Sequence, residues 1–186
     1  MKNATIRVGI ATTVMLGLMT AVPTASAAER SVPKENTPIA TVEIKGIKVD
    51  RKASAETRRL IEADPLAAAA AANACGPGYT ISTGAWRYGA YGSTYTWTNG
   101  TSSGSGYYDK PICALFFNDT GASRSIGVRL SSNYTADPTV EDFGTYSSYA
   151  GPLYQKRGYC GTVYSYMKDS NGKVVVDNTQ TIGACN

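Results

Sequence analysis

Short alternating segments of apolar and polar residues fill the C-terminal part of this 186-residue chain, from residue 74 onward. Clusters of Gly, Asn and Asp separate these segments, and no long run repeats its apolar residues with the helical period. Seven short strands are predicted, at residues 78–83, 93–99, 112–119, 125–132, 144–155, 160–168 and 173–181. Residues 74–186 are therefore expected to form one all-β domain, a compact β-sandwich or barrel.

Residues 28–73 have a different pattern, because they contain no aromatic residue and are rich in charge. Such a segment buries too little apolar area to form a core of its own, so we expect a poorly structured pro-segment or flexible arm. Two local signals stand against this reading. "TVEIKGIKVD" alternates weakly, as a marginal strand would, and "SAETRRLIEAD" fits a short helix with Ser54 as N-cap and Pro65 as its stop. The alternative is a helical extension packed on the domain.

Residues 1–27 have the pattern of a secretory signal peptide. Lys2 and Arg7 precede an apolar stretch, and Ala25-Ser26-Ala27 offers small residues for cleavage after Ala27. The apolar stretch is too short for a spanning helix, which needs ~20 residues, and threonines interrupt it. The product is therefore expected to be secreted, without a membrane span.

The expected export indicates the chemical state of the four cysteines, which are Cys75, Cys113, Cys160 and Cys185. An even number in an exported chain predicts two disulfides. A four-thiolate zinc site is disfavoured because the cysteines do not occur in close pairs.

The turn at Asn171–Gly172 predicts how these cysteines pair. It lies between two β-rich runs, as in a two-residue hairpin, and opposed residue numbers then sum to 343. Cys160 faces Gly183 in this register, and Cys185 lies diagonally at ~7–8 Å, against the ~4.4–6.8 Å between the Cα atoms of a disulfide. A bulge at Gly183 or a Gly172–Lys173 loop would close that gap. Cys160–Cys185 and Cys75–Cys113 are therefore favoured, with the other connectivities left open.

Charge and composition argue against several functions. Of the 18 basic residues, 16 remain after the signal is removed, against 14 acidic residues, and no basic stripe marks a nucleic-acid surface. The chain has no histidine, which removes histidine-dependent catalysis and histidine metal sites. We expect no enzyme, metal or cofactor. The cluster of Asp137, Glu141 and Asp142 is interpreted as a solvated loop, with a calcium site, a catalytic pair and an inhibitory loop as alternatives.

Aromatic residues are the strongest positive feature. In "AWRYGAYGSTYTWT", Trp86 and Tyr88 share one strand face, as do Tyr95 and Trp97. With "GAYG" as the turn, the two pairs could meet across strands and form a stacking platform for sugars. Packing over a small core is the alternative for the same residues. Tyr107 and Tyr108, in "GSGYYDK", are expected in an exposed loop.

Short motifs across residues 74–186 resemble the spore-associated protein A family of actinomycetes. They are "CGPGYTI", "ICALFFND", "DFGTYSSYAGPLY" and "GYCGTV", followed by a last cysteine near the C-terminus. The resemblance implies a small extracellular protein associated with spores or aerial growth, with no established catalytic residues. "SSYAGPLYQKRGYC" itself predicts two strand pieces around a Gly-Pro kink, with Tyr149 and Tyr154 packed beside it. The leading hypothesis is a non-catalytic envelope or spore-surface protein that adheres to a cell-wall or spore-surface polymer through exposed aromatics. The alternatives are a carbohydrate-binding module and a secreted protease inhibitor.

Overall fold

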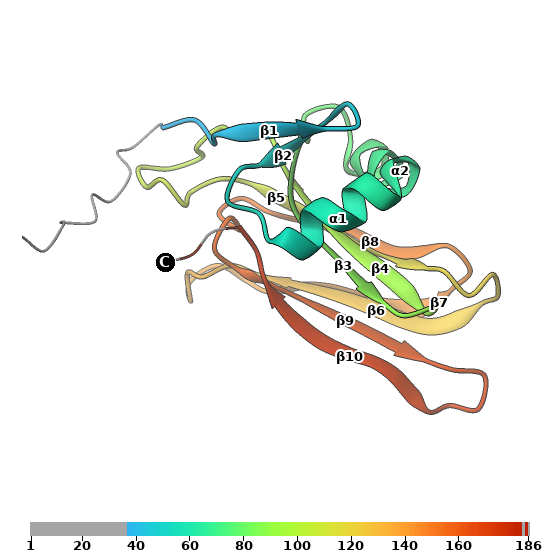
Figure 1. Cartoon of the computed structure of the whole chain (residues 1–186). Coiled ribbons are helices and arrows are strands. Elements are labelled where there is room, and N and C mark those ends of the chain that lie inside the picture. The colour runs from blue at the N-terminus through green and yellow to red at the C-terminus, as the bar shows by residue number, and fades with distance from the viewer. Residues whose placement is uncertain (1–36, 184, 186) are drawn as a thin grey trace, which may run out of the picture. The chain divides into compact units, whose positions relative to one another are not determined.

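Two β-sheets stacked face to face make up the fold, as the computed structural model shows for residues 37–183 and 185 (Figure 1). The larger sheet has six strands in the order β1-β2-β3-β4-β5-β8, and the smaller has four in the order β10-β9-β6-β7. The elements are β1 (Thr41–Ile44), β2 (Ile47–Asp50), α1 (Ala55–Ala63), α2 (Pro65–Cys75), β3 (Ile81–Tyr88), β4 (Gly92–Thr98), β5 (Ile112–Asn118), β6 (Arg124–Ser131), β7 (Val140–Tyr146), β8 (Tyr149–Gln155), β9 (Thr162–Lys168) and β10 (Val174–Thr181).

The expected all-β class is confirmed, with two sheets and two disulfides. The described residues form ten strands rather than seven. Two of the additional strands lie upstream of residue 74. The third arises because the segment predicted as one strand at 144–155 breaks at Ser147–Ser148, where the chain passes from one sheet to the other.

The main core lies between the two sheets. Trp86, Ile112 and Phe116 of the six-stranded sheet meet Val128 and Met167 of the four-stranded sheet, and all are buried. Alternation explains this arrangement, because every second residue of β6 and β9 points into the sandwich. The residues between them face outward, and they become important for the candidate site.

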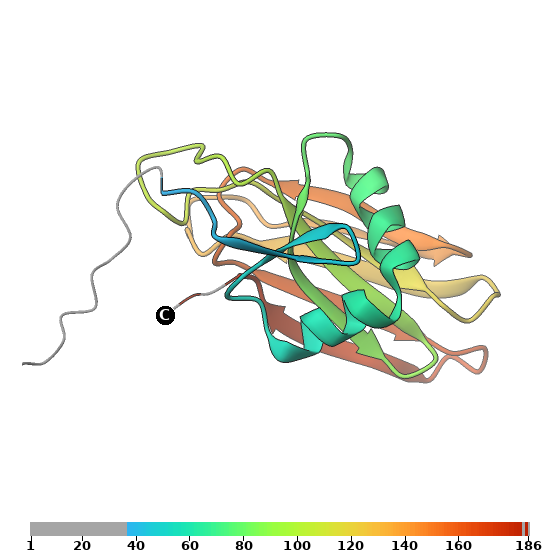
Figure 2. The same ribbon diagram turned by 45° about the horizontal axis from the view of Figure 1, so that its top comes forward.

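Two helices cover the other face of the six-stranded sheet and the β1–β2 hairpin extends its edge, which corrects the expectation of a flexible arm. β2 pairs in parallel with β3, and both helices pack on the sheet (Figure 2). Leu60 and Ile61 of α1 and Ala68 and Ala71 of α2 form a second core with β4 and β5. The segment needs no core of its own, because it contributes small apolar faces to a sheet that already carries large aromatics.

The structure confirms the local predictions of strand and capped helix in this segment. "TVEIKGIKVD" forms two strands joined at Lys45–Gly46, and Ser54 caps α1 by accepting a hydrogen bond from Thr57 N at 3.0 Å. Pro65 ends α1 and also begins α2, where a missing N–H costs nothing. The predicted signal at 1–27 and the start of the predicted arm at 28–36 lie outside the described residues, and removal of the arm by a protease stays a prediction.

The β9–β10 hairpin confirms the predicted register and the predicted disulfides. Asp169 N bonds to Lys173 O at 2.9 Å, so the loop has three residues, but a shift at Val174/Val176 restores pairs whose numbers sum to 343, such as Thr181↔Thr162. Gly183 then leaves the extended conformation with a φ of 68°. The Cα atoms are 5.4 Å apart in Cys160–Cys185 and 5.8 Å apart in Cys75–Cys113.

The Gly-Pro kink also occurs as predicted. β8 is an edge strand of its sheet, and its pairing with β5 shifts between Ala114 and Phe116, opposite Gly151–Pro152. Tyr149 packs on Phe117 at a ring-centroid distance of 5.8 Å. Tyr154 packs on Tyr79 at 5.5 Å and donates a hydrogen bond to Cys75 O at 3.2 Å.

Candidate functional site

The predicted stacking platform of Trp86, Tyr88, Tyr95 and Trp97 is wrong. Their two strands do form a hairpin around "GAYG", but Trp86 is opposite Thr94 and Tyr95 is opposite Ala85. Trp86 and Tyr88 therefore point into the core between the sheets, whereas Tyr95 and Trp97 point toward the helices. Trp86, Tyr95 and Trp97 are 7%, 0% and 2% exposed, so these residues are core and present no surface to a polymer.

Tyr107 is likewise buried rather than exposed. Its ring packs edge-on against Tyr159 at 5.9 Å, and the ammonium of Lys110 lies 4.0 Å from its centroid. Tyr108 is half-buried and packs against the rings of Tyr107 and Tyr159. The loop that carries them is thus fastened to the body of the protein.

Two buried tyrosines predict a loss of stability at high pH. Burial raises the pKa of Tyr95 to about 12, and burial together with the Asp50 carboxylate raises that of Tyr159. The unfolded chain ionises near pH ~10, so the stabilisation is complete below that pH and is lost as the pH rises toward the folded-state values. The free energy of unfolding should fall by about 1.4 kcal/mol per pH unit for each tyrosine.

Urea unfolding at pH values on either side of ~10 measures this effect. Tyr95→Phe is the informative variant, because the Tyr95 hydroxyl has no hydrogen-bond partner among the described residues. It should be at least as stable as the parent at neutral pH, because it removes an unpartnered buried hydroxyl, and it should show a shallower decline at high pH. An unchanged decline would show that Tyr95 does not contribute.

The three acids of the "TADPTVEDFG" segment are not brought together. Asp137 forms an ion pair with Arg157, and Glu141 forms one with Arg129 at 2.7 Å. Asp142 accepts hydrogen bonds from Tyr146 Oη at 2.5 Å and from Gly151 N at 2.7 Å. Each carboxylate has its own structural partner. Within residues 37–183, no group of three or more Cys, Asp or Glu side chains is placed to hold a metal ion.

An exposed aromatic cluster occurs instead on the outer side of the four-stranded sheet. We call it the aromatic face and define it as Phe143 of β7, Tyr164 and Tyr166 of β9, and Arg129 of β6. Strand pairing brings these residues together, since Gly127 is opposite both Phe143 and Tyr166, and Arg129 is opposite Tyr164. Phe143 is 41% exposed, and the two tyrosines are partly exposed.

The three rings form one continuous group. Their centroids are 6.1 to 6.4 Å apart, and the plane of Tyr164 is inclined by only 28° to Tyr166 and 31° to Phe143. Gly127 makes this possible, because a Cβ there would lie 2.0 Å from Phe143 Cδ1. The Phe143 ring therefore lies over the glycine, in the space that a side chain would fill.

Polar contacts fix the cluster in place. The Arg129 guanidinium lies 5.4 Å from the centroids of both Phe143 and Tyr164 while it pairs with Glu141. Tyr164 Oη donates to Asp177 Oδ1 at 2.9 Å. Burial raises the pKa of Tyr164 and this hydrogen bond raises it further, so the hydroxyl is protonated at neutral pH.

The tyrosines of the aromatic face were not among the predicted site residues, although their strand carries a signal for them. In "TVYSYMK", the tyrosines alternate with Val163, Ser165 and Met167, which are all buried. Strand alternation alone thus places Tyr164 and Tyr166 on the opposite face from the core residues. Phe143 had no comparable signal, because its segment was interpreted as a loop.

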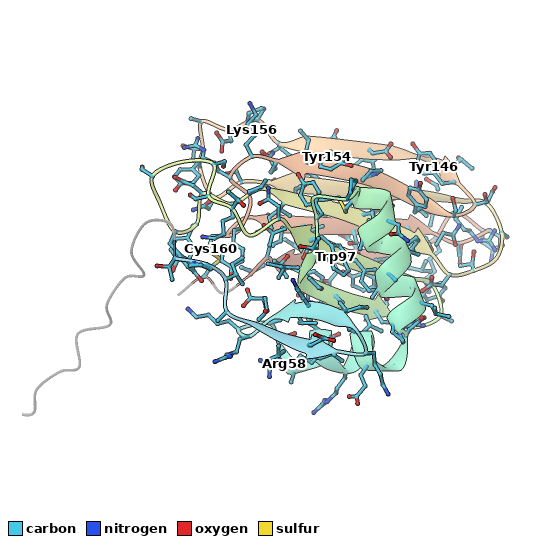
Figure 3. All side chains as sticks on the ribbon, turned by 90° about the horizontal axis from the view of Figure 1, so that it is seen from above. Arg58, Trp97, Tyr146, Tyr154, Lys156 and Cys160 are labelled. Carbon is cyan, nitrogen blue, oxygen red and sulfur yellow. A yellow bond between two sulfur atoms is a disulfide. The ribbon has the colours of Figure 1, made fainter. Side chains whose placement is uncertain are left out.

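A second candidate is a cavity of about 540 Å³ lined by residues of the β1–β2 hairpin, the C-terminal half of α2 and Trp97. Figure 3 shows Trp97 between the hairpin and α2. Alanine methyls, Ile47, Pro77 and Tyr79 line it, with Lys48 and Asn73 among the polar residues. The cavity exists because α2 presents mainly the small side chains of Ala69 and Ala72 there. The Trp97 indole N–H has no partner among the described residues, but it is sealed from the cavity by other atoms.

The fold and site define an all-β, two-sheet protein with one covered outer face and one open aromatic face. The helices and the hairpin contact the six-stranded sheet, and no described element packs over the outer side of the four-stranded sheet (Figure 1). No protein-family model, curated protein or solved structure matches the chain. None of the helices within residues 37–183 has the length and apolar character needed to cross a bilayer.

Proposed function

We propose that this chain is a secreted, non-catalytic protein that adheres to a cell-envelope or spore-surface polymer through its aromatic face. The observation that carries the proposal is the exposure of three adjoining rings on a sheet face that no described element covers. Single exposed aromatics are common on protein surfaces, but a contiguous group of rings such as this one is typical of an interaction site. The two disulfides and the two-sheet core provide a rigid support for those rings.

Three further features support the proposal. Disulfides persist outside the cell, and the predicted signal would deliver the chain there. The resemblance to spore-associated protein A points to spores or aerial growth. The acids that sequence analysis considered for catalysis are each engaged in a structural contact. The protease-inhibitor hypothesis stays a prediction, and no contact in the structure favours it.

Retention on washed spores and envelopes tests this function. The full chain should be released by mild detergent, and the triple variant Phe143→Ser, Tyr164→Ser, Tyr166→Ser should shift to the culture fluid. Losing three ring contacts worth about 0.5–1.5 kcal/mol each should weaken retention tenfold or more.

Tyr91→Ser provides the matched control, because Tyr91 is also 41% exposed but lies in the β3–β4 turn. It should be retained like the parent. Equal retention of the parent and the triple variant would remove the aromatic face from the proposal, and recovery of the parent chain only from culture fluid would remove surface association.

A further inference from the structure

We infer that the aromatic face binds a neutral polysaccharide, whose sugar rings stack on Phe143, Tyr164 and Tyr166. This inference rests on the proposed function and names the class of polymer. Its starting point is the position of the rings in the sheet. Phe143, Gly127 and Tyr166 lie in one row across β7, β6 and β9, and Glu141, Arg129 and Tyr164 lie in the next.

The rings provide an apolar surface of the kind that sugars can use. The C–H groups on one side of a pyranose ring are apolar, and they pack against aromatic side chains. Three adjoining rings with centroids 6.1 to 6.4 Å apart can contact more than one sugar of a chain. Tyrosine and phenylalanine lose few side-chain degrees of freedom on binding, and here Gly127, Arg129 and Asp177 already restrict them.

The charges of this face favour a neutral ligand. Arg129 is paired with Glu141, and Asp177 accepts the Tyr164 hydroxyl, so the charges nearest the rings are engaged within the protein. Lys168 is the remaining cation on this face, where β9 ends. Two cations therefore stand against two carboxylates, which leaves no surplus of positive charge to attract a polyphosphate or another polyanion.

Short hydroxyl side chains surround the rings. Strand alternation places them on the same outer face, with Ser125 opposite Thr145 and Thr179 opposite Tyr164. The hydroxyl side chains of this outer face are Ser125, Ser131, Thr145, Thr162, Thr179 and Thr181. Each both donates and accepts hydrogen bonds, and a polysaccharide offers hydroxyls of the same kind.

The same border argues against an apolar protein partner. A stable protein interface buries ~800 Å² on each side and has an apolar centre. Three rings enclosed by hydroxyls and ion pairs provide a narrow apolar strip rather than such a centre. A chain of sugars alternates apolar ring faces with hydroxyls, and this matches the composition of the face.

The test uses the full chain and insoluble polymers as probes, namely cellulose, chitin and a β-1,3-glucan, with immobilised polyphosphate as the anionic counterpart. Binding to at least one neutral glycan is expected. It should be unchanged between low salt and about 1 M salt, where charge attraction extends only ~3 Å. Tyr164→Ala/Tyr166→Ala should reduce the bound fraction about tenfold, since two ring contacts are lost.

Two further variants show which property of the rings matters. Tyr164→Phe/Tyr166→Phe keeps the rings and should bind as the parent does. Its binding would show that the rings, and not the hydroxyls, are needed. Tyr91→Ala should have no effect, because it removes an exposed tyrosine from elsewhere. The urea midpoint of each variant verifies that it is folded.

Failure of this inference can be distinguished from failure of the proposed function. A protein that stays on spores or envelopes through its aromatic face but binds no neutral glycan overturns the inference alone. Binding only to polyphosphate, or glycan binding that survives Tyr164→Ala/Tyr166→Ala, also overturns it. Absence of both glycan binding and surface retention overturns both proposals.

Discussion

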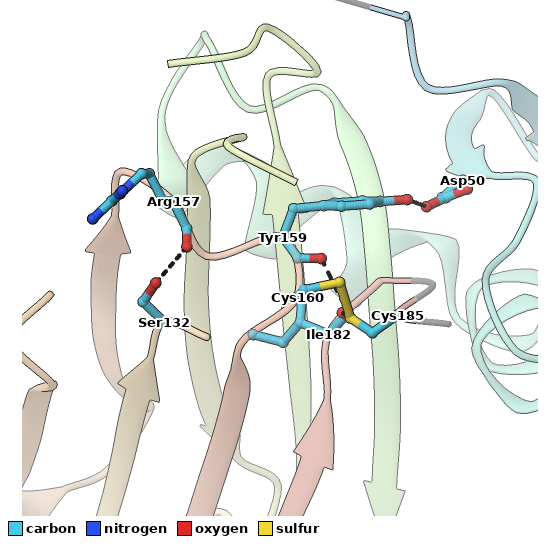
Figure 4. The surroundings of a disulfide bond; sticks show 7 residues. All are labelled: Asp50, Ser132, Arg157, Tyr159, Cys160, Ile182 and Cys185. Carbon is cyan, nitrogen blue, oxygen red and sulfur yellow. Dashed lines mark hydrogen bonds between the residues drawn. A yellow bond between two sulfur atoms is a disulfide. The ribbon is translucent and has the colours of Figure 1, made fainter. Parts of the chain in front are cut away.

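Asp50→Ala is expected to lower the free energy of unfolding by about 1–3 kcal/mol, because it leaves the buried Tyr159 hydroxyl without its acceptor. Asp50 is 1% exposed, and its Oδ2 accepts the hydrogen bond of Tyr159 Oη (Figure 4). Lys110 is buried close by, and its pKa is lowered by burial and raised again by Asp109 and Asp50. Without Asp50, the buried Tyr159 hydroxyl loses its acceptor, and the buried Lys110 ammonium loses the favourable field of a nearby carboxylate.

The size of the effect follows from the cost of buried polar groups without partners. A buried donor left unsatisfied costs ~1–3 kcal/mol. Urea unfolding of the parent and the variant measures the difference. Tyr159→Phe should also lower the free energy of unfolding, because it leaves Asp50 Oδ2, an oxygen of a buried carboxylate, without its donor.

Glu43→Ala is the matched control, since Glu43 is an exposed acid on the same hairpin. Its effect should stay within about 0.5 kcal/mol. If the effect of Asp50→Ala also fell within that range, the Asp50–Tyr159 hydrogen bond would not stabilise the packing of the β1–β2 hairpin against Tyr159.

The second large effect is expected from Cys75→Ala/Cys113→Ala. This disulfide closes a loop with a sequence separation of 38, for which the chain-entropy model gives about 4 kcal/mol. Alanine is the appropriate replacement because both cysteines are buried in the second core, where a serine hydroxyl would lack a partner. The bridge also joins the end of α2 to β5, so its loss should loosen the helices in particular.

Hydrogen exchange of α1 and α2, together with urea unfolding, measures both parts of this prediction. Cys160→Ala/Cys185→Ala is the comparison, because that disulfide has a similar separation of 25 but lies at the other end of the chain. It should lower stability by a similar amount without selective loss of protection in the helices. Equal protection of the helices in both variants would contradict the local role of Cys75–Cys113.

Alternation and turn chemistry predicted most of the C-terminal strands and the β9–β10 register. The two aromatic pairs of the predicted platform do not meet across the strands because of the length of one turn. With Tyr88 opposite Gly92, the β3–β4 loop has three residues, and opposed numbers sum to an even value. Trp86 then shares a face with Thr94 rather than with Tyr95. A loop of two residues would have placed both aromatic pairs on one face, so a change of one residue decided the outcome.

The N-terminal segment departs from the predicted flexible arm for a different reason. Its own residues cannot form a core, and that much of the sequence argument was correct. However, Val49, Leu60 and Ile61 pack against Tyr95, Trp97 and Leu115, which come from strands more than 30 residues away. No pattern within the segment predicts which residues of β4 and β5 it packs against. Only the long-range packing shows why β4 is buried along its whole length.

Helices cover the outer side of one sheet only, so the two sides of the molecule differ and binding through one side would orient the protein. A protein held on a polymer by the outer side of β6, β7 and β9 turns its other side, with α1 and α2, toward the surrounding medium. Molecules adsorbed in this way would all present the same charged helix, α1, to whatever approaches next. A layer of such molecules would replace the chemistry of the bare polymer with that of a single helical surface.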